Sequence, residues 1–439
     1  MTIREYLLSE GYRIPDSEYY ADVDEWLSWY KGDQTDFHKY TIYNGKNHIA
    51  QYHRRLYMAK QICEDWANLL MTENVSVTVG GTWQERLDEI LHTNNFQARA
   101  NQLVELTFAS GSGAFVEYLG RNNEPNIDYV RGGMIFPLSW DNGEVTECAF
   151  GSSRIVNGKK ACYLQIHRVE NGKYVIQNVI FEIKSGDLLP LPDGMAESID
   201  TGSDIPMFQI IKPNIVNNLF LDNPLGISIF ANAMDILKSC DLVYDCYCTE
   251  FLLGRKRLLV PTSVLQQTGI VDGPPAFDPN DLVYQAVPDE AVEQIKEFNG
   301  ALRAQEHEIA LKRNLSQLSA KCGLGYDRYQ FDGVAPKTAT EVISTRSDTY
   351  ASKCKHEQVL RHAITGMVRA LAYLDGAAVD EITVEFDDSI ITDRKADFAE
   401  YKELVSMGIM RPEELRSWYF NEDIDTAKKN MPESSALLE

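Results

Sequence analysis

The segment from Asn223 to Val342 constrains the fold more than any other part of this 439-residue chain. Its residue pattern predicts a helix over 227–253, a segment punctuated by proline and glycine, and a second helix over 290–320. A glycine-rich loop and a third helix over 339–374 follow. The first helix alone would span about 40 Å. Long helices around a loop, in a chain without catalytic motifs, indicate a structural device.

The helix over 290–320 is polar on most of its faces. Such a helix is unstable on the surface of a monomer unless neighbouring elements support it. A ring of identical subunits would supply this support if the helix packed against the 226–254 helix of the next subunit. A large single domain could also cover it, so the polar pattern alone leaves both explanations open.

The rest of the chain predicts an α+β fold. Helices are expected over 17–30, ending at Gly32, over 54–70 and over 84–109, with a strand at 75–79. From 111 to 212 the pattern alternates, and turn pairs recur at short intervals, which predicts a β-rich module of six to eight strands. These pairs are Asn142-Gly143, Asn157-Gly158, Asn171-Gly172 and Ser185-Gly186. A strand over 382–386 and a helix-turn-helix segment around Gly408 complete the chain.

Composition limits the classes of function. With 44% hydrophobic and 10% aromatic residues the chain reads as globular. No apolar run approaches the roughly 20 residues of a membrane span, and the N-terminus lacks a signal peptide, so we expect a soluble protein and no membrane partner. The net charge of −23 disfavours a sequence-specific DNA-binding protein. The charge is consistent with simple solubility, or with a surface past which DNA slides without binding.

Motifs for enzymatic chemistry are absent or weak. The chain has neither a Gly-x4-Gly-Lys-Ser/Thr loop nor a Gly-x-Gly-x-x-Gly turn, so no cofactor site is predicted. The acidic run near 385–393 could bind Mg²⁺ for nuclease chemistry, but a solvated strand end is the favoured interpretation. Cys240, Cys246 and Cys248 are expected to be buried thiols rather than metal ligands. We therefore predict no metal and no enzyme.

Several short motifs, taken in order, resemble the portal proteins of long-tailed phages that infect Gram-positive hosts. Each motif is weak by itself, but their order extends over nearly the whole chain. They are Trp29-Tyr30-Lys31-Gly32, Met58-Ala59-Lys60 through Asp65-Trp66-Ala67-Asn68-Leu69-Leu70 with Glu73, Asn223-Pro224-Leu225-Gly226-Ile227-Ser228, Gly254-Arg255-Lys256-Arg257, Lys337-Thr338-Ala339-Thr340-Glu341-Val342 and Asp388-Ser389-Ile390.

The resemblance implies a portal fold with named parts in a fixed order. These are a wing with the β-rich module (1–225), a stem helix (226–254), a small clip (255–289), a second stem helix (290–320), a tunnel loop (321–337), a long wing helix and strand (338–386) and a C-terminal helical crown (387–439). Glycine gives backbone freedom to such a loop, and its expected hinges are Gly323, Gly325 and Gly333. The residues expected to face DNA are Tyr326, Arg328, Tyr329 and Lys337.

The resemblance also implies an assembly, most often of twelve subunits, around a DNA channel at one capsid vertex. Such a ring guides DNA during packaging and ejection, and it docks the terminase and the head-tail connector. Its further partners would be the major capsid and scaffold proteins, with assembly in the host cytoplasm and a final place in the virion. The basic residues Arg255, Lys256 and Arg257 either cap the preceding helix or dock a partner at the clip. The alternatives are a metal-dependent nuclease-like enzyme and a minor capsid or adaptor protein that forms no ring.

Overall fold

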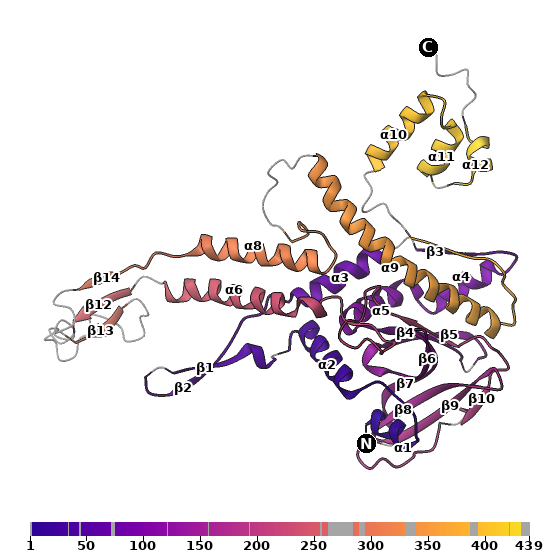
Figure 1. Cartoon of the computed structure of the whole chain (residues 1–439), viewed down its shortest axis with the longest axis horizontal. Coiled ribbons are helices and arrows are strands. Elements are labelled where there is room, and N and C mark those ends of the chain that lie inside the picture. Colours follow the sequence, from indigo (N-terminus) through magenta and orange to yellow (C-terminus); the bar gives the residue numbers. More distant parts are fainter. Residues whose placement is uncertain are drawn as a thin grey trace, which may run out of the picture.

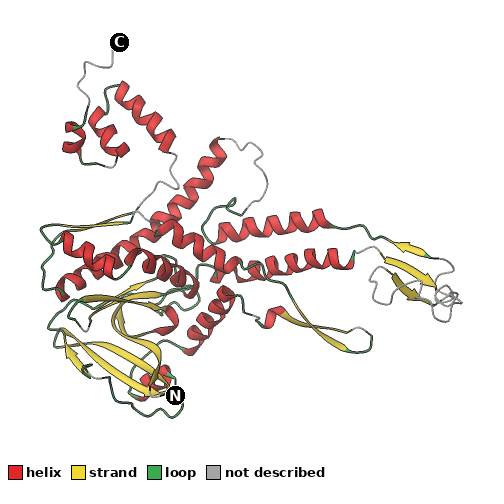
Figure 2. Cartoon of the chain, turned by 180° about the vertical axis from the view of Figure 1, so that it is seen from behind, coloured by secondary structure: helices red, strands yellow, loops and turns green. Residues whose placement is uncertain are grey.

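The chain folds into a mixed α+β body from which a pair of long helices projects, as the computed structural model shows (Figure 1). Three short C-terminal helices lie apart from the body at the other side (Figures 1 and 2). The predicted α+β class is therefore confirmed. The structure describes residues 2–33, 35–43, 45–71, 75–120, 122–156, 158–192, 194–254, 257–261, 284–288, 295–329, 339–386, 394–420 and 422–431.

Five helices open the chain, and their ends follow local signals. They are α1 (Ile3–Ser9), α2 (Ser17–Lys31), α3 (Met58–Leu70), α4 (Gln84–Thr93) and α5 (Phe96–Ser110). Helix α2 ends at Gly32, which takes the left-handed conformation with φ 70°, as predicted. Helix α3 begins later than the predicted residue 54, because Tyr57 before it is also left-handed with φ 60°.

The single helix predicted over 84–109 is wrong, because the structure divides it at Asn94 and Asn95. Asn95 has φ 48°, which turns the chain between α4 and α5. The side chain of Asn94 donates to the carbonyl of Pro125 and accepts from the amide of Ile127 at 2.9 Å. The break between α4 and α5 therefore depends on hydrogen bonds to strand β5, which is distant in the sequence. The periodicity of apolar residues within a helix cannot predict such bonds.

Eight strands form the predicted β-rich module, arranged in two sheets. The three-stranded sheet has the order β11-β4-β5, and the five-stranded sheet has the order β10-β9-β8-β7-β6. The turns at Asn142-Gly143 and Asn171-Gly172 have positive φ at both residues, as tight hairpins require. The strands are β4 (Gly113–Leu119), β5 (Pro125–Arg131), β6 (Ile135–Asp141), β7 (Glu144–Val156), β8 (Lys159–Glu170), β9 (Lys173–Glu182), β10 (Ser198–Asp200) and β11 (Phe208–Ile211).

The projecting pair consists of α6 (Met234–Leu253) and α8 (Ala304–Lys321), with a small sheet at its tip. The tip sheet has the order β13-β12-β14, formed by β12 (Arg257–Pro261), β13 (Tyr284–Val287) and β14 (Lys296–Phe298). Helix α6 has 20 residues and so spans about 30 Å rather than 40 Å.

Both projecting helices start later than the sequence predicted. Residues 227–233 stay in the body, where the amide of Ile229 donates to the carbonyl of Phe108 at 2.9 Å and Phe230 is fully buried. The predicted helix over 290–320 loses its first part because Lys296–Phe298 pairs with β12 instead. Both corrections have one cause, since each lost helical segment bonds to a partner far away in the chain.

The long helix α9 (Ala339–Leu374) has the predicted limits, and it crosses the body beside α3 and the three-stranded sheet. Strand β15 (Ile382–Glu385), also predicted, pairs antiparallel with β3 (Ser76–Val79). The C-terminal helices are α10 (Arg394–Ser406), α11 (Pro412–Phe420) and α12 (Ile424–Lys429), which confirms helix-turn-helix structure around Gly408.

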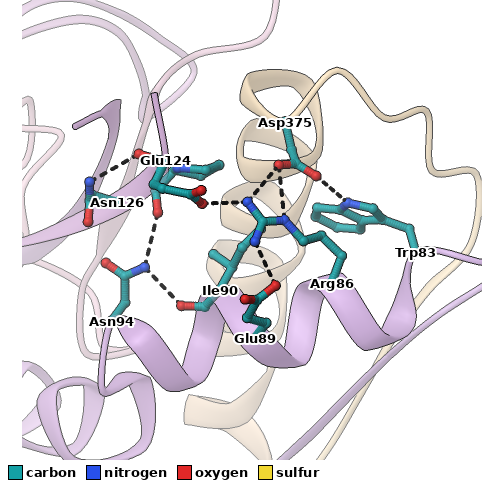
Figure 3. A network of polar contacts seen from close by, with 9 residues as sticks. Trp83, Arg86, Glu89, Ile90, Asn94, Glu124, Asn126 and Asp375 are labelled. Carbon is teal, nitrogen blue, oxygen red and sulfur yellow. Dashed lines mark hydrogen bonds and ion pairs between the residues drawn. The ribbon is translucent and has the colours of Figure 1, made fainter. Parts of the chain in front are cut away.

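One large core joins α2, α3, α5, the three-stranded sheet, the inner end of α8 and α9. A polar network on the surface ties α4 to the end of α9 (Figure 3). Arg86 bonds to Glu89 and to Asp375, and the indole N–H of Trp83 donates to the same Asp375 carboxylate at 2.8 Å. Because Arg86 is partly exposed, each of these ion pairs contributes little stability, but together they orient the two helices.

A close crossing of two backbone segments joins the β-rich module to the segment that leads into α6. Gly226 donates its N–H to the Ser112 hydroxyl, and its carbonyl accepts from the Tyr19 hydroxyl at 2.9 Å. A side-chain carbon added at Gly226 would lie 2.4 Å from the carbonyl oxygen of Gly111. Only glycine therefore fits at this position.

We expect Gly226→Ala to destabilise the protein by about 2–3 kcal/mol, because the new methyl group meets rigid backbone rather than a flexible side chain. The midpoint of urea unfolding should fall accordingly. Gly133→Ala is the matched control, since its added carbon would meet only Val23 Cγ1 at 3.9 Å. Equal midpoints for the two variants would contradict the proposed crowding.

Candidate functional site at the root of the α8–α9 loop

The chain leaves α8 through a turn that is held by α3. Gly323 and Gly325 have φ 79° and 75°, so the turn favours glycine at both positions; their role as hinges stays a prediction. The indole N–H of Trp66 donates to the carbonyl of Cys322 at 2.9 Å. A side-chain carbon at Gly323 would lie only 3.2 Å from the Trp66 ring. The first residues of the loop are thus fixed against a fully buried tryptophan.

Asp65 holds the other side of the same turn. Its carboxylate accepts one bond from the Arg328 guanidinium at 2.9 Å and one from the Tyr329 hydroxyl at 2.8 Å. Burial, with the Asp65 charge beside it, raises the pKa of Tyr329 above its ordinary value, so the phenol stays a proton donor. Charge-assisted bonds of this kind are about twice as strong as neutral ones.

Helix α9 closes the site over Trp66. The His356 ring packs edge-on against Trp66 with centroids 4.7 Å apart, and its Nδ1 accepts the amide of Asn214 at 3.0 Å. Burial lowers the pKa of His356 to about 3, so the ring is neutral at physiological pH. One turn away, Lys353 and Glu357 form an ion pair at 2.5 Å in which both side chains are buried.

The predicted DNA-facing residues take different positions. Tyr326 is 61% exposed, whereas Tyr329 is only 8% exposed and bonded to Asp65. Tyr329 is therefore an anchor within its own chain, which corrects the sequence prediction that it faces DNA. Arg328 is engaged by Asp65 as well. Gly333 and Lys337 lie outside the described residues.

The end of α6 is joined to α8 by an ion pair that the sequence did not single out. Glu250 accepts bonds from the backbone and the guanidinium of Arg303, the shorter at 2.8 Å, just before α8 begins. Arg255 and Lys256, predicted to cap α6 or to dock a partner, lie outside the described residues. Arg257 begins strand β12.

A second cluster fixes α6 to a hairpin made by β1 (Lys39–Tyr43) and β2 (His48–Tyr52). Asp241 accepts from the His38 ring at 3.0 Å and from the Leu56 amide at 2.7 Å. Asp245, one turn further, bonds to the His53 ring at 3.0 Å and to Arg54 at 2.7 Å. Sequence reasoning missed this cluster, although two acids spaced i, i+4 in an apolar helix were its signal.

Other chemistry predicted from sequence finds no support in the described part of the chain. Among the described residues no three His, Cys, Asp or Glu side chains gather as metal ligands. Glu385 and Phe386 line a shallow groove with Arg361, while 387–393 lie outside the described residues. Cys240 is buried as expected, but Cys246 is exposed and Cys248 is only half-buried, which corrects the prediction that all three are buried thiols. No described helix is long and apolar enough to cross a membrane.

Comparison with known proteins adds one strong match. A family model described as "Phage portal protein, SPP1 Gp6-like" matches residues 15–435. A solved structure titled "Neck of native GTA particle computed with C12 symmetry" is similar at 10% identity and a TM-score of 0.46, over 82% of this chain and 88% of that one. No curated protein matches this chain in sequence.

We expect Asp65→Asn to loosen the loop root without unfolding the body. The asparagine side chain that replaces Asp65 has one acceptor oxygen, so it can accept a hydrogen bond from only one of the two partners. Loss of the charge-assisted bond to Arg328 should cost about 1.5–3 kcal/mol of local stability. Hydrogen exchange over 322–329 should accelerate by about tenfold or more. Glu64→Gln is the control, because the side chain of this neighbouring acid is 46% exposed and pairs with Lys60, away from the loop root. Unchanged exchange at 322–329 in Asp65→Asn would show that Asp65 is not the anchor.

Proposed function

The chain belongs to the SPP1 Gp6-like family of phage portal proteins, and on this premise we propose that it closes into a ring of identical subunits around a DNA channel. The family is structural rather than enzymatic. We propose twelve subunits at one capsid vertex, with DNA entering during packaging and leaving at ejection. The terminase and the head-tail connector would dock on the ring, and the hydrolysis of ATP would belong to the terminase.

The projecting pair of α6 and α8 carries this proposal. Two antiparallel helices that stand out from a body, with their outer flanks uncovered, suit the wall of a channel built from copies placed side by side (Figure 1). Apolar side chains on these flanks are exposed in the single chain, including Leu242 at 42%, Phe251 at 42% and Ile309 at 67%. Contact with the next copy would cover some of them.

The other parts take their roles from their place along the chain. The tip sheet of β12, β13 and β14 would form the clip that meets the terminase and later the connector. The loop between α8 and α9 would reach into the channel, and α10–α12 would form a small crown inside the capsid. The net charge of −23 per subunit would keep the channel from trapping DNA through phosphate contacts.

The first test is the particle formed by the purified protein. We expect a closed ring of ten to fourteen copies with a central hole, measured by native mass and negative-stain images. Assembly should be tested with and without scaffold protein. A chain that stays monomeric or dimeric under both conditions would contradict the proposal.

The loop is tested separately at Tyr326, the exposed aromatic residue at its root. We propose that its ring contacts passing DNA, so Tyr326→Ala should leave ring mass unchanged and lower the amount of DNA retained per particle by severalfold. Tyr118→Ala is the matched control, because Tyr118 is 41% exposed on β4 in the body. Equal packaging in both variants would remove Tyr326 from the mechanism.

A further inference from the structure

The hairpin of β1 and β2, residues 39–52, stands out from the body as an arm (Figures 1 and 2). Among the described residues its two strands pair only with each other. It exposes apolar side chains on both faces, with Ile42 at 48% and Ile49 at 41% on one, and Tyr43 at 60% and Tyr52 at 51% on the other. A lone hairpin of this kind is marginal in water, so its exposed faces indicate a binding surface.

The base of the arm is nevertheless built rigidly. His38, just before β1, is 1% exposed and bonded to Asp241 of α6, and the backbone of His53 just after β2 donates to the His38 carbonyl at 2.9 Å. Asp245 holds His53 and Arg54. Three bonds to carboxylates of α6, together with this backbone bond, therefore fix the base of the arm against α6, although within the described part of the chain the strands of the arm pair only with each other.

The arm is also basic in a strongly acidic protein. No Asp or Glu occurs between Asp36 and Glu64, in a chain of net charge −23. The arm itself holds Lys39 and Lys46; of the cations that follow it in this stretch, Arg54 pairs with Asp245 and Lys60 pairs with Glu64. On average the surface of a second copy of this chain attracts such a segment.

The arrangement of elements indicates which surface of a second copy the arm meets. In both views α6 lies between α8 on one side and the arm on the other (Figures 1 and 2). In a ring built by head-to-tail contacts, one flank of each copy meets the opposite flank of the next. The arm side of one copy then faces the α8 side of its neighbour.

Helix α8 has a surface that suits the arm. Its buried side chains, Leu315, Leu318 and Ser319, all lie in its second half. In its first half Ile309 is 67% exposed beside two exposed acids, Glu306 and Glu308, of which Glu308 pairs with Lys312 of the same helix. An exposed isoleucine beside acidic side chains complements an arm that carries two paired isoleucines, two lysines and no acid.

We propose that the arm of each copy packs on the first half of α8 of the next copy, with the Ile42–Ile49 pair against Ile309. This inference rests on the proposed ring and specifies one of its contacts. It also revises the packing expected for the polar helix: α6 of the same chain supports one face of α8, and the neighbour's arm covers another.

A disulfide trap tests the contact. In a Cys246→Ser background, which removes the exposed thiol, the double variant Ile49→Cys and Ile309→Cys should form covalent chains of subunits under mild oxidation. The pair cannot close within one copy, because α6 lies between the two sites. Single variants, and Ile155→Cys combined with Ile309→Cys, should form none; Ile155 is a 77% exposed isoleucine on β7.

Loss of apolar contact gives a second, independent readout. Ile42→Ser with Ile49→Ser should raise the concentration at which rings half-dissociate by about tenfold, and Ile155→Ser should not. Intact rings with no cross-link and no change in dissociation would overturn the arm contact while leaving the proposed function standing. Rings of unchanged stability that bind DNA less well would assign the arm to nucleic acid instead. A protein that forms no ring would contradict both proposals.

Discussion

The contact between α3 and the α8–α9 loop root fixes the rest of the structure. Trp66 is fully buried, and it bonds to the end of α8 through Cys322 while its ring packs against His356 of α9. Asp65 beside it holds Arg328 and Tyr329. The end of α8 and helix α9, both more than 250 residues beyond α3 in the chain, thus meet on two consecutive side chains of α3. Because interiors are close-packed, neither α8 nor α9 can shift without moving this pair or breaking its bonds.

What the sequence predicts well here depends on short-range chemistry. Gly32 ends α2 because it accepts a left-handed conformation, and the Asn-Gly pairs turn the chain between strands for the same reason. Helix α9 has the predicted limits because 36 residues of continuous pattern leave little room for another assignment. In the candidate site, the glycines at 323 and 325 were predictable on these grounds.

The errors share a physical cause, which is a partner distant in the chain. Helix α4 ends at Asn94 because the side chain of this residue donates a hydrogen bond to strand β5. Lys296–Phe298 is a strand because it pairs with β12. Tyr329 lies in a segment whose sequence predicts an exposed loop, yet Asp65, 264 residues away, accepts a hydrogen bond from its hydroxyl. The local pattern of apolar and polar residues does not predict which distant residues form hydrogen bonds. The anchoring residues of the site are therefore recognised only in the three-dimensional structure.

The single chain leaves two kinds of surface unsatisfied, and they are complementary. Its arm exposes apolar side chains and carries two lysines without an acid, and the outer half of α8 exposes one isoleucine beside Glu306 and Glu308. Both surfaces are held firmly. Buried carboxylates of α6 hold the base of the arm, and the hydrophobic core holds the inner end of α8. A rigid surface loses little conformational entropy on binding. For the same buried area, two rigid surfaces therefore bind more tightly than two flexible ones. In the proposed ring, the acidic excess that would keep DNA from adhering would also make the next subunit a favourable partner for the arm.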